Sequence, residues 1–116
     1  MKLELVLDSA SVIRGEKVNG RVDVIEGGPA RSLKLTLTFH EQTQSYAVVR
    51  YDSGGVIHEG DLVTGIPVEF DFTLPDAAPP SLKCEHSELY WELTITSDEQ
   101  GLDTLVQRRL EVIPKP

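Results

Sequence analysis

The sequence predicts a single all-β domain: an immunoglobulin-like β-sandwich of about seven or eight antiparallel strands. Three observations support this prediction. Apolar and polar residues alternate with a period of two along most of the chain. Glycine, proline and acidic residues cluster between the alternating segments, where they favour turns. The length of 116 residues fits one domain, spanning 1–116, with a hydrophobic core of ordinary size.

Alternation is clearest in 32–41, where leucine or phenylalanine occupies every odd position from Leu33 to Phe39. A strand of this kind buries one face and exposes the other, so several such strands must pair into two sheets around a core. The residues expected to face inward are Leu3, Leu5 and Leu7 in 2–8; Val18, Val22 and Val24 in 16–25; Leu33, Leu35, Leu37 and Phe39 in 32–41; Ile66, Val68, Phe70, Phe72 and Leu74 in 66–74; Leu89, Trp91, Leu93 and Ile95 in 88–97; and Val106, Leu110 and Val112 in 104–113.

Turn residues separate these segments at 26–29, 53–55 and 98–101, where glycine supplies positive φ and Asp or Ser bonds nearby backbone. The connection 75–87 is different because it holds three prolines, which cannot donate to a sheet ladder. We expect this connection to cross from one sheet to the other as an extended segment.

Two blocks of the sequence resemble the arrestin N-terminal-type domain. The first, 12–22, places a glycine and a glutamate before a strand that contains a further glycine. The second has an aromatic strand ending in Leu-Pro at 68–75, a Pro-Pro-Ser step at 79–81 and a strand at 89–93 with an aromatic just before its apolar run. The arrestin-like family includes arrestins, arrestin-domain adaptors, the arrestin-fold subunit of retromer and bacterial sporulation-control proteins. The resemblance implies a sandwich that recruits or scaffolds other proteins without catalysis.

The chain also departs from this family. Typical members have two such domains, whereas this sequence accounts for one. It lacks the basic cluster that visual arrestins use to sense phosphate or receptors. Receptor desensitisation, phosphate sensing and endocytic sorting are therefore not carried over.

Charge and composition narrow the class of partner. The formal net charge is −8, from 19 acidic and 11 basic residues, and no basic patch for nucleic acid is visible. No segment has the roughly 20 apolar residues of a membrane span, and none resembles a signal peptide. The single cysteine, Cys84, suits a reducing compartment. We expect a cytoplasmic protein with no nucleic-acid partner and no integral membrane contact.

No catalytic constellation, resident metal or cofactor is predicted. The glycine spacing of 15–22 lacks the Lys-Ser/Thr step of a phosphate-binding loop, and favours a turn before a strand with a glycine bulge. Cys84 and His86 offer two metal ligands, too few for a tetrahedral site unless His40, His58 or a carboxylate joins them. The acidic turn 98–103 does not have the spacing of a calcium-binding EF-hand loop. A metal or small-ligand sensor using Cys84–His86 is the alternative function, and a hydrolase is a weaker third.

The hairpin 45–61 is the candidate partner-binding surface. Tyr46, Val48, Tyr51 and Ile57 lie among apolar residues on both of its faces, which requires two-sided burial or an exposed apolar patch. At a sheet edge this hairpin would add strands to a protein partner or to a second copy of the chain. The simpler alternative is that one face covers the core and the other is incidental.

Arg108 is out of pattern, because it shares the inward register of Val106, Leu110 and Val112. An unpaired charge inside a core is costly. Three interpretations stay open: a bulge turns it outward, a carboxylate pairs with it at the end of the sandwich, or it faces a partner subunit. The other isolated polar candidates, His40 and His58, are interpreted as lone surface histidines.

Overall fold

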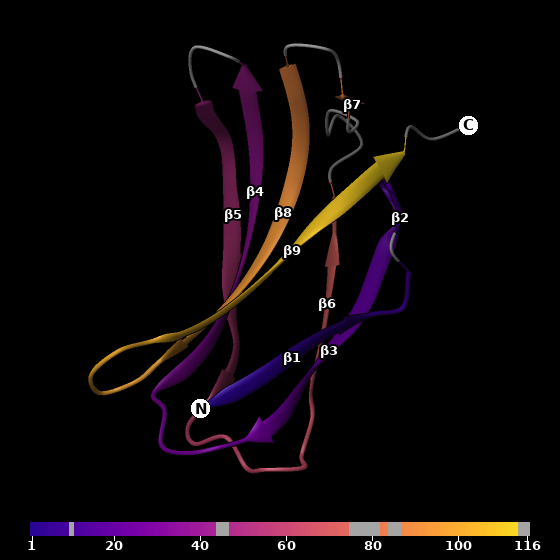
Figure 1. The fold of residues 1–116 in the computed structure, drawn as a ribbon. Helices are drawn as coiled ribbons and strands as arrows, with labels where there is room; N and C mark the ends of the chain where they lie inside the picture. The colour runs from indigo at the N-terminus through magenta and orange to yellow at the C-terminus, as the bar shows by residue number, and fades with distance from the viewer. Residues whose placement is uncertain (10, 44–46, 75–81, 84–86, 114–116) are drawn as a thin grey trace.

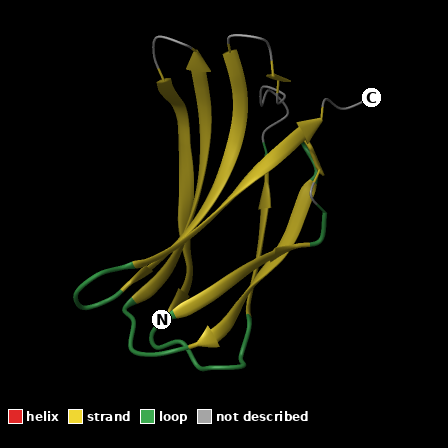
Figure 2. Cartoon of the chain, viewed as in Figure 1, coloured by secondary structure: helices red, strands yellow, loops and turns green. Residues whose placement is uncertain are grey.

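The computed structural model describes residues 1–9, 11–43, 47–74, 82–83 and 87–113, with side chains except at 47–54 and 82. Within these ranges the chain forms nine strands and no helix, so the all-β prediction is confirmed (Figures 1 and 2). No helix in this part of the chain is long and apolar enough to span a membrane. The strands are β1 (Lys2–Leu7), β2 (Ser11–Ile13), β3 (Lys17–Glu26), β4 (Ser32–Thr43), β5 (Ala47–Glu59), β6 (Val68–Thr73), β7 (Leu82–Lys83), β8 (Ser87–Asp98) and β9 (Thr104–Ile113).

The strands form two sheets (Figure 1). The three-stranded sheet has the order β1-β3-β6, and the six-stranded sheet has the order β2-β9-β8-β4-β5 with β7 beside β8. The expectation of antiparallel strands is wrong at one place, because β2 pairs with β9 in parallel. After β1 the chain passes from the three-stranded to the six-stranded sheet, where β2 runs in the same direction as β9. Alternation indicates a strand but carries no information about its direction.

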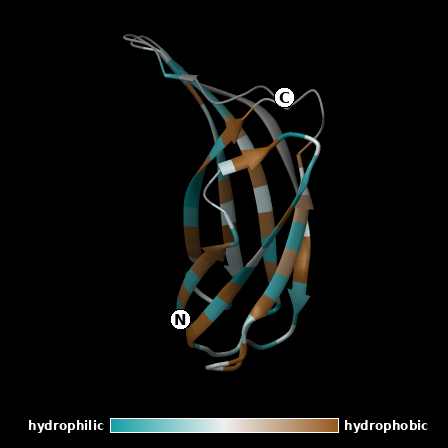
Figure 3. Cartoon of the chain, turned by 90° about the vertical axis from the view of Figure 1, so that its right-hand side faces the viewer, coloured by the Kyte–Doolittle hydropathy of each residue, from teal (hydrophilic) through white to brown (hydrophobic). Residues whose placement is uncertain are grey.

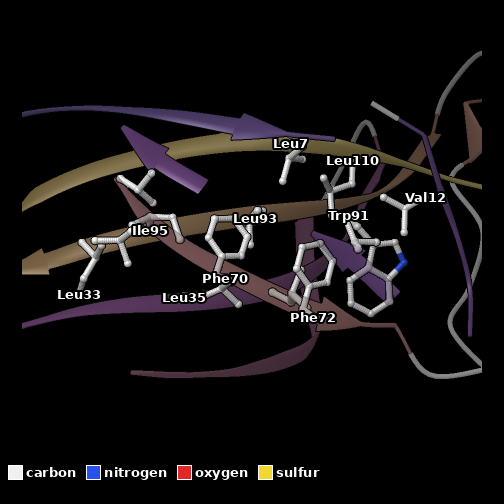
Figure 4. Packing of buried hydrophobic residues seen from close by; sticks show 14 of the residues in the cluster. Leu7, Val12, Leu33, Leu35, Phe70, Phe72, Trp91, Leu93, Ile95 and Leu110 are labelled. Carbon is white, nitrogen blue, oxygen red and sulfur yellow. The ribbon is translucent and has the colours of Figure 1, made fainter. Parts of the chain in front are cut away.

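Side chains from both sheets form one hydrophobic cluster between them (Figure 4). Trp91, predicted to lie in the core, is 1% exposed, and its ring centroid is 5.2 Å from that of Phe39. Burying side chains of this size contributes about 1.5–3 kcal/mol each. Figure 3 shows the alternation of apolar and polar residues along the strands that produces this arrangement.

Ile66 departs from the prediction that it faces the core. β6 begins only at Val68, and Ile66 is 60% exposed. Gly65 takes a φ of 84°, and the Ile66 N–H donates to the Val63 carbonyl at 3.0 Å, so the chain turns here instead of extending. Pro67 follows and cannot donate to a ladder.

The predicted glycine bulge in 15–22 is also wrong. Gly20 sits in uninterrupted register between Leu7 of β1 and Phe70 of β6. A Cβ added there would lie 2.7 Å from Cζ of Phe70, so the glycine allows close packing of the two neighbouring side chains. The expected turn before the strand is present, with Gly15 at a φ of 81°.

Candidate functional site

A groove of about 300 Å³ lies where β5 ends and β6 begins. Its walls come from the last residues of β5, the loop 60–67 and the first residues of β6. Aliphatic side chains make up most of the lining, and two carboxylates stand among them. The lining residues are Ile57, His58, Asp61, Leu62, Val63, Ile66, Pro67, Val68 and Glu69.

β5 brings two consecutive side chains to this groove because its register shifts there. His58 pairs with Leu33 and Val56 pairs with Lys34, so Ile57 between them has no counterpart in β4. An extra residue of this kind is a β-bulge, which bends the strand and re-aims a side chain. Ile57 accordingly packs against the core and lines the groove beside His58, whereas Val56 is 55% exposed.

Main-chain hydrogen bonds anchor the loop 60–67 to the end of β3. Leu62 and Gly28 exchange two of them, with N···O distances of 3.0 and 2.9 Å. The Gly65 N–H donates to the Val24 carbonyl at 2.9 Å. The Leu62 side chain is 4% exposed and belongs to the core. The loop therefore has a fixed main-chain path.

This anchored loop presents two aliphatic side chains to solvent. Val63 and Ile66 are each 60% exposed, and both line the groove. Large aliphatic side chains held on a fixed loop beside a groove are typical of surfaces that bind other molecules. The alternating pattern predicted Ile66 to lie in the core and gave no indication of Val63. Gly65 and Pro67 are the sequence signal for the exposed position of Ile66, because glycine favours a turn and proline cannot donate to a sheet ladder.

The charge of the groove is negative. Asp61 Oδ1 accepts the Ala30 N–H at 3.2 Å, which places this carboxylate at the groove wall. His58 Nε2 lies 3.2 Å from the Asp61 carbonyl oxygen. Glu69 is exposed on β6. No lysine or arginine is among the described residues that line the groove.

Of the predicted partner-binding residues, the structure places Ile57 in this groove. Tyr46 lies outside the described residues. Val48 and Tyr51 belong to β5, where they pair with Glu41 and Phe39 of β4, and their side chains lie outside the described part. The predicted hairpin 45–61 is wrong, because Ala47–Glu59 is one continuous strand and residues 53–55, predicted to turn, pair with β4. Within the described chain β5 is nevertheless an edge strand of its sheet.

A second polar surface covers the outward face of the six-stranded sheet. His40 stacks on Tyr90 with a centroid distance of 4.7 Å, and the Arg109 guanidinium carbon lies 3.9 Å from the Tyr90 ring centroid. Arg109 Nη1 donates to Glu88 Oε1 at 2.6 Å, and this hydrogen bond raises the pKa of Arg109. His40 Nε2 is buried without a hydrogen-bond partner, 3.4 Å from Glu92 Oε1. His40 is therefore not the lone surface histidine that its sequence position indicated.

Arg108 keeps the inward register, so the bulge proposed for it is wrong. It pairs with Leu93 in an uninterrupted ladder between β8 and β9 and is half-buried. Within the described residues it has neither a hydrogen bond nor an ion pair, so a carboxylate partner is also not found there. The third interpretation, that Arg108 faces a partner subunit, stays a prediction.

The remaining chemical candidates give no assembled site in the described chain. Cys84 and His86 lie outside the described residues. Among the residues that are described, no group of three or more His, Cys, Asp or Glu side chains is placed to hold a metal. In the acidic turn, Glu99 Oε2 accepts the Thr104 N–H at 2.9 Å and Asp103 Oδ1 accepts the Glu99 N–H at 3.0 Å. These carboxylates close the turn by binding backbone.

No protein-family model matches the sequence, and no curated protein matches it. Among solved structures, the chain is similar to Spo0M, a sporulation control protein from Bacillus subtilis, with a TM-score of 0.67 and 20% sequence identity. The match covers 96% of this chain and 48% of Spo0M, so the chain spans about half the length of that protein. At this identity the similarity establishes the fold. The predicted resemblance is confirmed at that level: the chain shares the arrestin-like fold of Spo0M.

Proposed function

We propose that this chain is a single-domain, non-catalytic protein-interaction or scaffolding module of arrestin-like type, built as an immunoglobulin-like sandwich and working in the cytoplasm. The observation that supports it is the groove between β5 and β6, where Val63 and Ile66 are each 60% exposed beside two sheet edges. Edge strands present unpaired N–H and C=O groups that another chain can pair with.

The partner is a protein, or a second copy of this chain, and it is held through an edge strand. The net charge of −8 argues against nucleic acid, because binding a phosphate backbone requires clustered cations. The similarity to Spo0M supports a regulatory domain of this fold. Spo0M is described as a sporulation control protein, and an adaptor-like role in a regulatory pathway is what we infer for this chain.

Site-specific photo-crosslinking in the native host tests the proposal. A benzophenone amino acid replaces Val63 in the groove or, as a matched control, Leu105, which is 53% exposed on β9 at the far side of the six-stranded sheet. We expect the Val63 probe to capture one recurrent protein, or this chain itself, that the Leu105 probe does not capture. Equal capture profiles at both positions contradict an interaction site at the groove.

Changing residues at the start of the segment 45–61 tests self-association separately. The double variant Tyr46→Lys, Val48→Glu places two charges on the predicted surface, and light scattering after size exclusion measures the oligomeric state. If this segment joins two copies, the variant is monomeric at concentrations where the parent chain is not. An unaltered oligomeric state together with unaltered crosslinks at Val63 counts against this segment as the contact.

A further inference from the structure

The two edges that flank the groove differ in how regular they are. β6 pairs with β3 over all six of its residues without a register shift, and in the described part of the chain its other edge is unpaired. β5 shifts register twice against β4, once at Ile57 and once opposite Phe39 and His40. Bulges interrupt strand addition, so β6 is the better template for an incoming strand.

The two faces of β6 have opposite chemistry. Val68, Phe70 and Phe72 point inward, and at 7–9% exposed they are among the less completely buried members of the core. Glu69 and Asp71 point outward and are exposed. A strand that pairs with β6 continues both faces, because directly opposed side chains lie on the same side of a sheet.

From this geometry we propose that β6 binds an extended segment of a partner protein in which apolar and basic residues alternate. The apolar residues of the segment cover Phe70 and Phe72 and reach the aliphatic groove at Ile66. The basic residues lie beside Glu69 and Asp71, where opposite charges across a strand pair are favourable. Asp61 extends this acidic side into the groove.

Two cations of β3 lie near this edge. Arg21 is directly opposite Glu69, but its Nε lies 2.9 Å from Asp23 Oδ1. Lys17 Nζ lies 3.6 Å from Asp71 Oδ2, but the two side chains are 61% and 59% exposed. Exposed pairs of this kind contribute little and exchange readily with another cation. No cation among the described residues forms an ion pair with Glu69. The inference rests on the proposed function, since it names the class of partner that an interaction module of this shape accepts.

A synthetic peptide tests the proposal directly. The probe is a fluorescein-labelled heptapeptide of alternating lysine and valine, and its binding to the purified chain is followed by fluorescence anisotropy. Three comparison peptides each change one feature. The first has glutamate in place of lysine, the second has the same composition with all lysines before all valines, and the third has N-methyl groups on alternate residues. We expect binding of the alternating lysine–valine peptide only, and stronger binding at low salt.

Protein variants locate the contact. The pair Glu69→Gln, Asp71→Asn is expected to weaken probe binding about fivefold, as two cross-strand charge pairs would. The matched pair Glu4→Gln, Glu26→Gln changes the net charge equally at exposed positions on the same sheet, and leaves binding within twofold. Hydrogen–deuterium exchange then reports protection of β6 amides on adding the probe.

Any of three results overturns the inference. The block peptide or the N-methylated peptide binds as tightly as the alternating probe, or the two variant pairs weaken probe binding equally. The third is that adding the probe protects the amides of β5, and not those of β6, from exchange. Probe binding that liposomes of neutral lipid compete away would instead indicate a membrane surface. A partner captured through Val63 whose contact segment is acidic or helical defeats this inference and leaves the proposed function standing. Absence of any Val63-specific capture defeats the proposed function itself.

Discussion

The centre of the larger sheet and the edge of the smaller sheet cover the same core to different degrees. On β8, at the centre of the six-stranded sheet, Trp91, Leu93 and Ile95 are 0–1% exposed, and the outward face above them is occupied by paired side chains. On β6, at the edge of the three-stranded sheet, the core residues are 7–9% exposed and the outer edge is unpaired in the described chain. The centre of the six-stranded sheet thus buries its core side chains completely, whereas the edge of the smaller sheet covers its own less fully.

The largest expected effect is a difference in the free energy of unfolding lost when two leucines, one from each sheet, are each changed to alanine. Leu93→Ala removes a side chain that is fully buried, and we expect a loss of about 4 kcal/mol in the free energy of unfolding. Leu7→Ala on β1 removes the same atoms from a site that is 9% exposed. Neighbouring side chains can relax into the space there, so we expect a loss of about 2.5 kcal/mol in the free energy of unfolding. Urea denaturation of both variants measures the difference. Equal losses would show that the two sheets seal the core alike.

A smaller effect sharpens the contrast within the three-stranded sheet. Gly20→Ala forces a Cβ to within 2.7 Å of Phe70 and 2.9 Å of Leu7, and overpacking of this kind costs about 1–3 kcal/mol. Gly55→Ala is the control, because an added Cβ at Gly55 on β5 meets nothing within 4 Å. Thermal unfolding compares the two variants. A Gly20→Ala protein as stable as Gly55→Ala contradicts close packing around β3.

The smallest expected effect concerns acid pH and the turn that joins β8 to β9. The hydrogen bond from Thr104 lowers the pKa of Glu99, and the Arg31 guanidinium lowers the pKa of Asp98. A carboxyl with a lowered folded-state pKa stabilises the fold above its unfolded pKa, and this contribution is lost as pH falls through the folded value. We therefore expect stability to decline below about pH 4.5.

The variant Glu99→Gln tests this assignment, since it removes the titrating group but keeps a hydrogen-bond acceptor. Melting temperatures measured between pH 3 and pH 7 should fall less steeply on acidification than those of the parent chain. A slope identical to that of the parent would show that Glu99 takes no part in the acid response.

Most of the long strands and most of the core were predictable because burial on one face leaves an alternating pattern in the chain itself. The short strands β2 and β7, and the buried Val12 and Leu62, were not predicted, because two or three residues are too few to show alternation and Leu62 lies in a loop. The alternation misplaced Ile66 because the pattern runs on through Gly65 and Pro67 although the strand has not yet begun. The stack of His40, Tyr90 and Arg109 joins three strands, and nothing local in any of them records which residues will stand side by side.

The groove was only partly predictable for the same reason. Ile57 was identified from the apolar residues of the segment 45–61, which was predicted as a hairpin but forms the single strand β5. Its position depends on a bulge that is set by pairing with β4. Glu69 looks like any outward residue of an alternating strand. Glu69 takes part in the proposed contact because β6 is the edge strand of its sheet. The order of strands in a sheet depends on the whole chain, so no local pattern indicates it.

The parallel pairing of β2 with β9 has a consequence for how the molecule is made. Ser11, Val12 and Ile13 lie against residues 111–113, about a hundred positions later in the chain. During synthesis these early residues leave the ribosome long before residues 111–113 have been made. Val12, which is 1% exposed in the folded protein, therefore stays exposed to solvent during that time. Contacts between such distant positions form slowly, so until this ladder is complete Val12 stays exposed to chaperones and proteases.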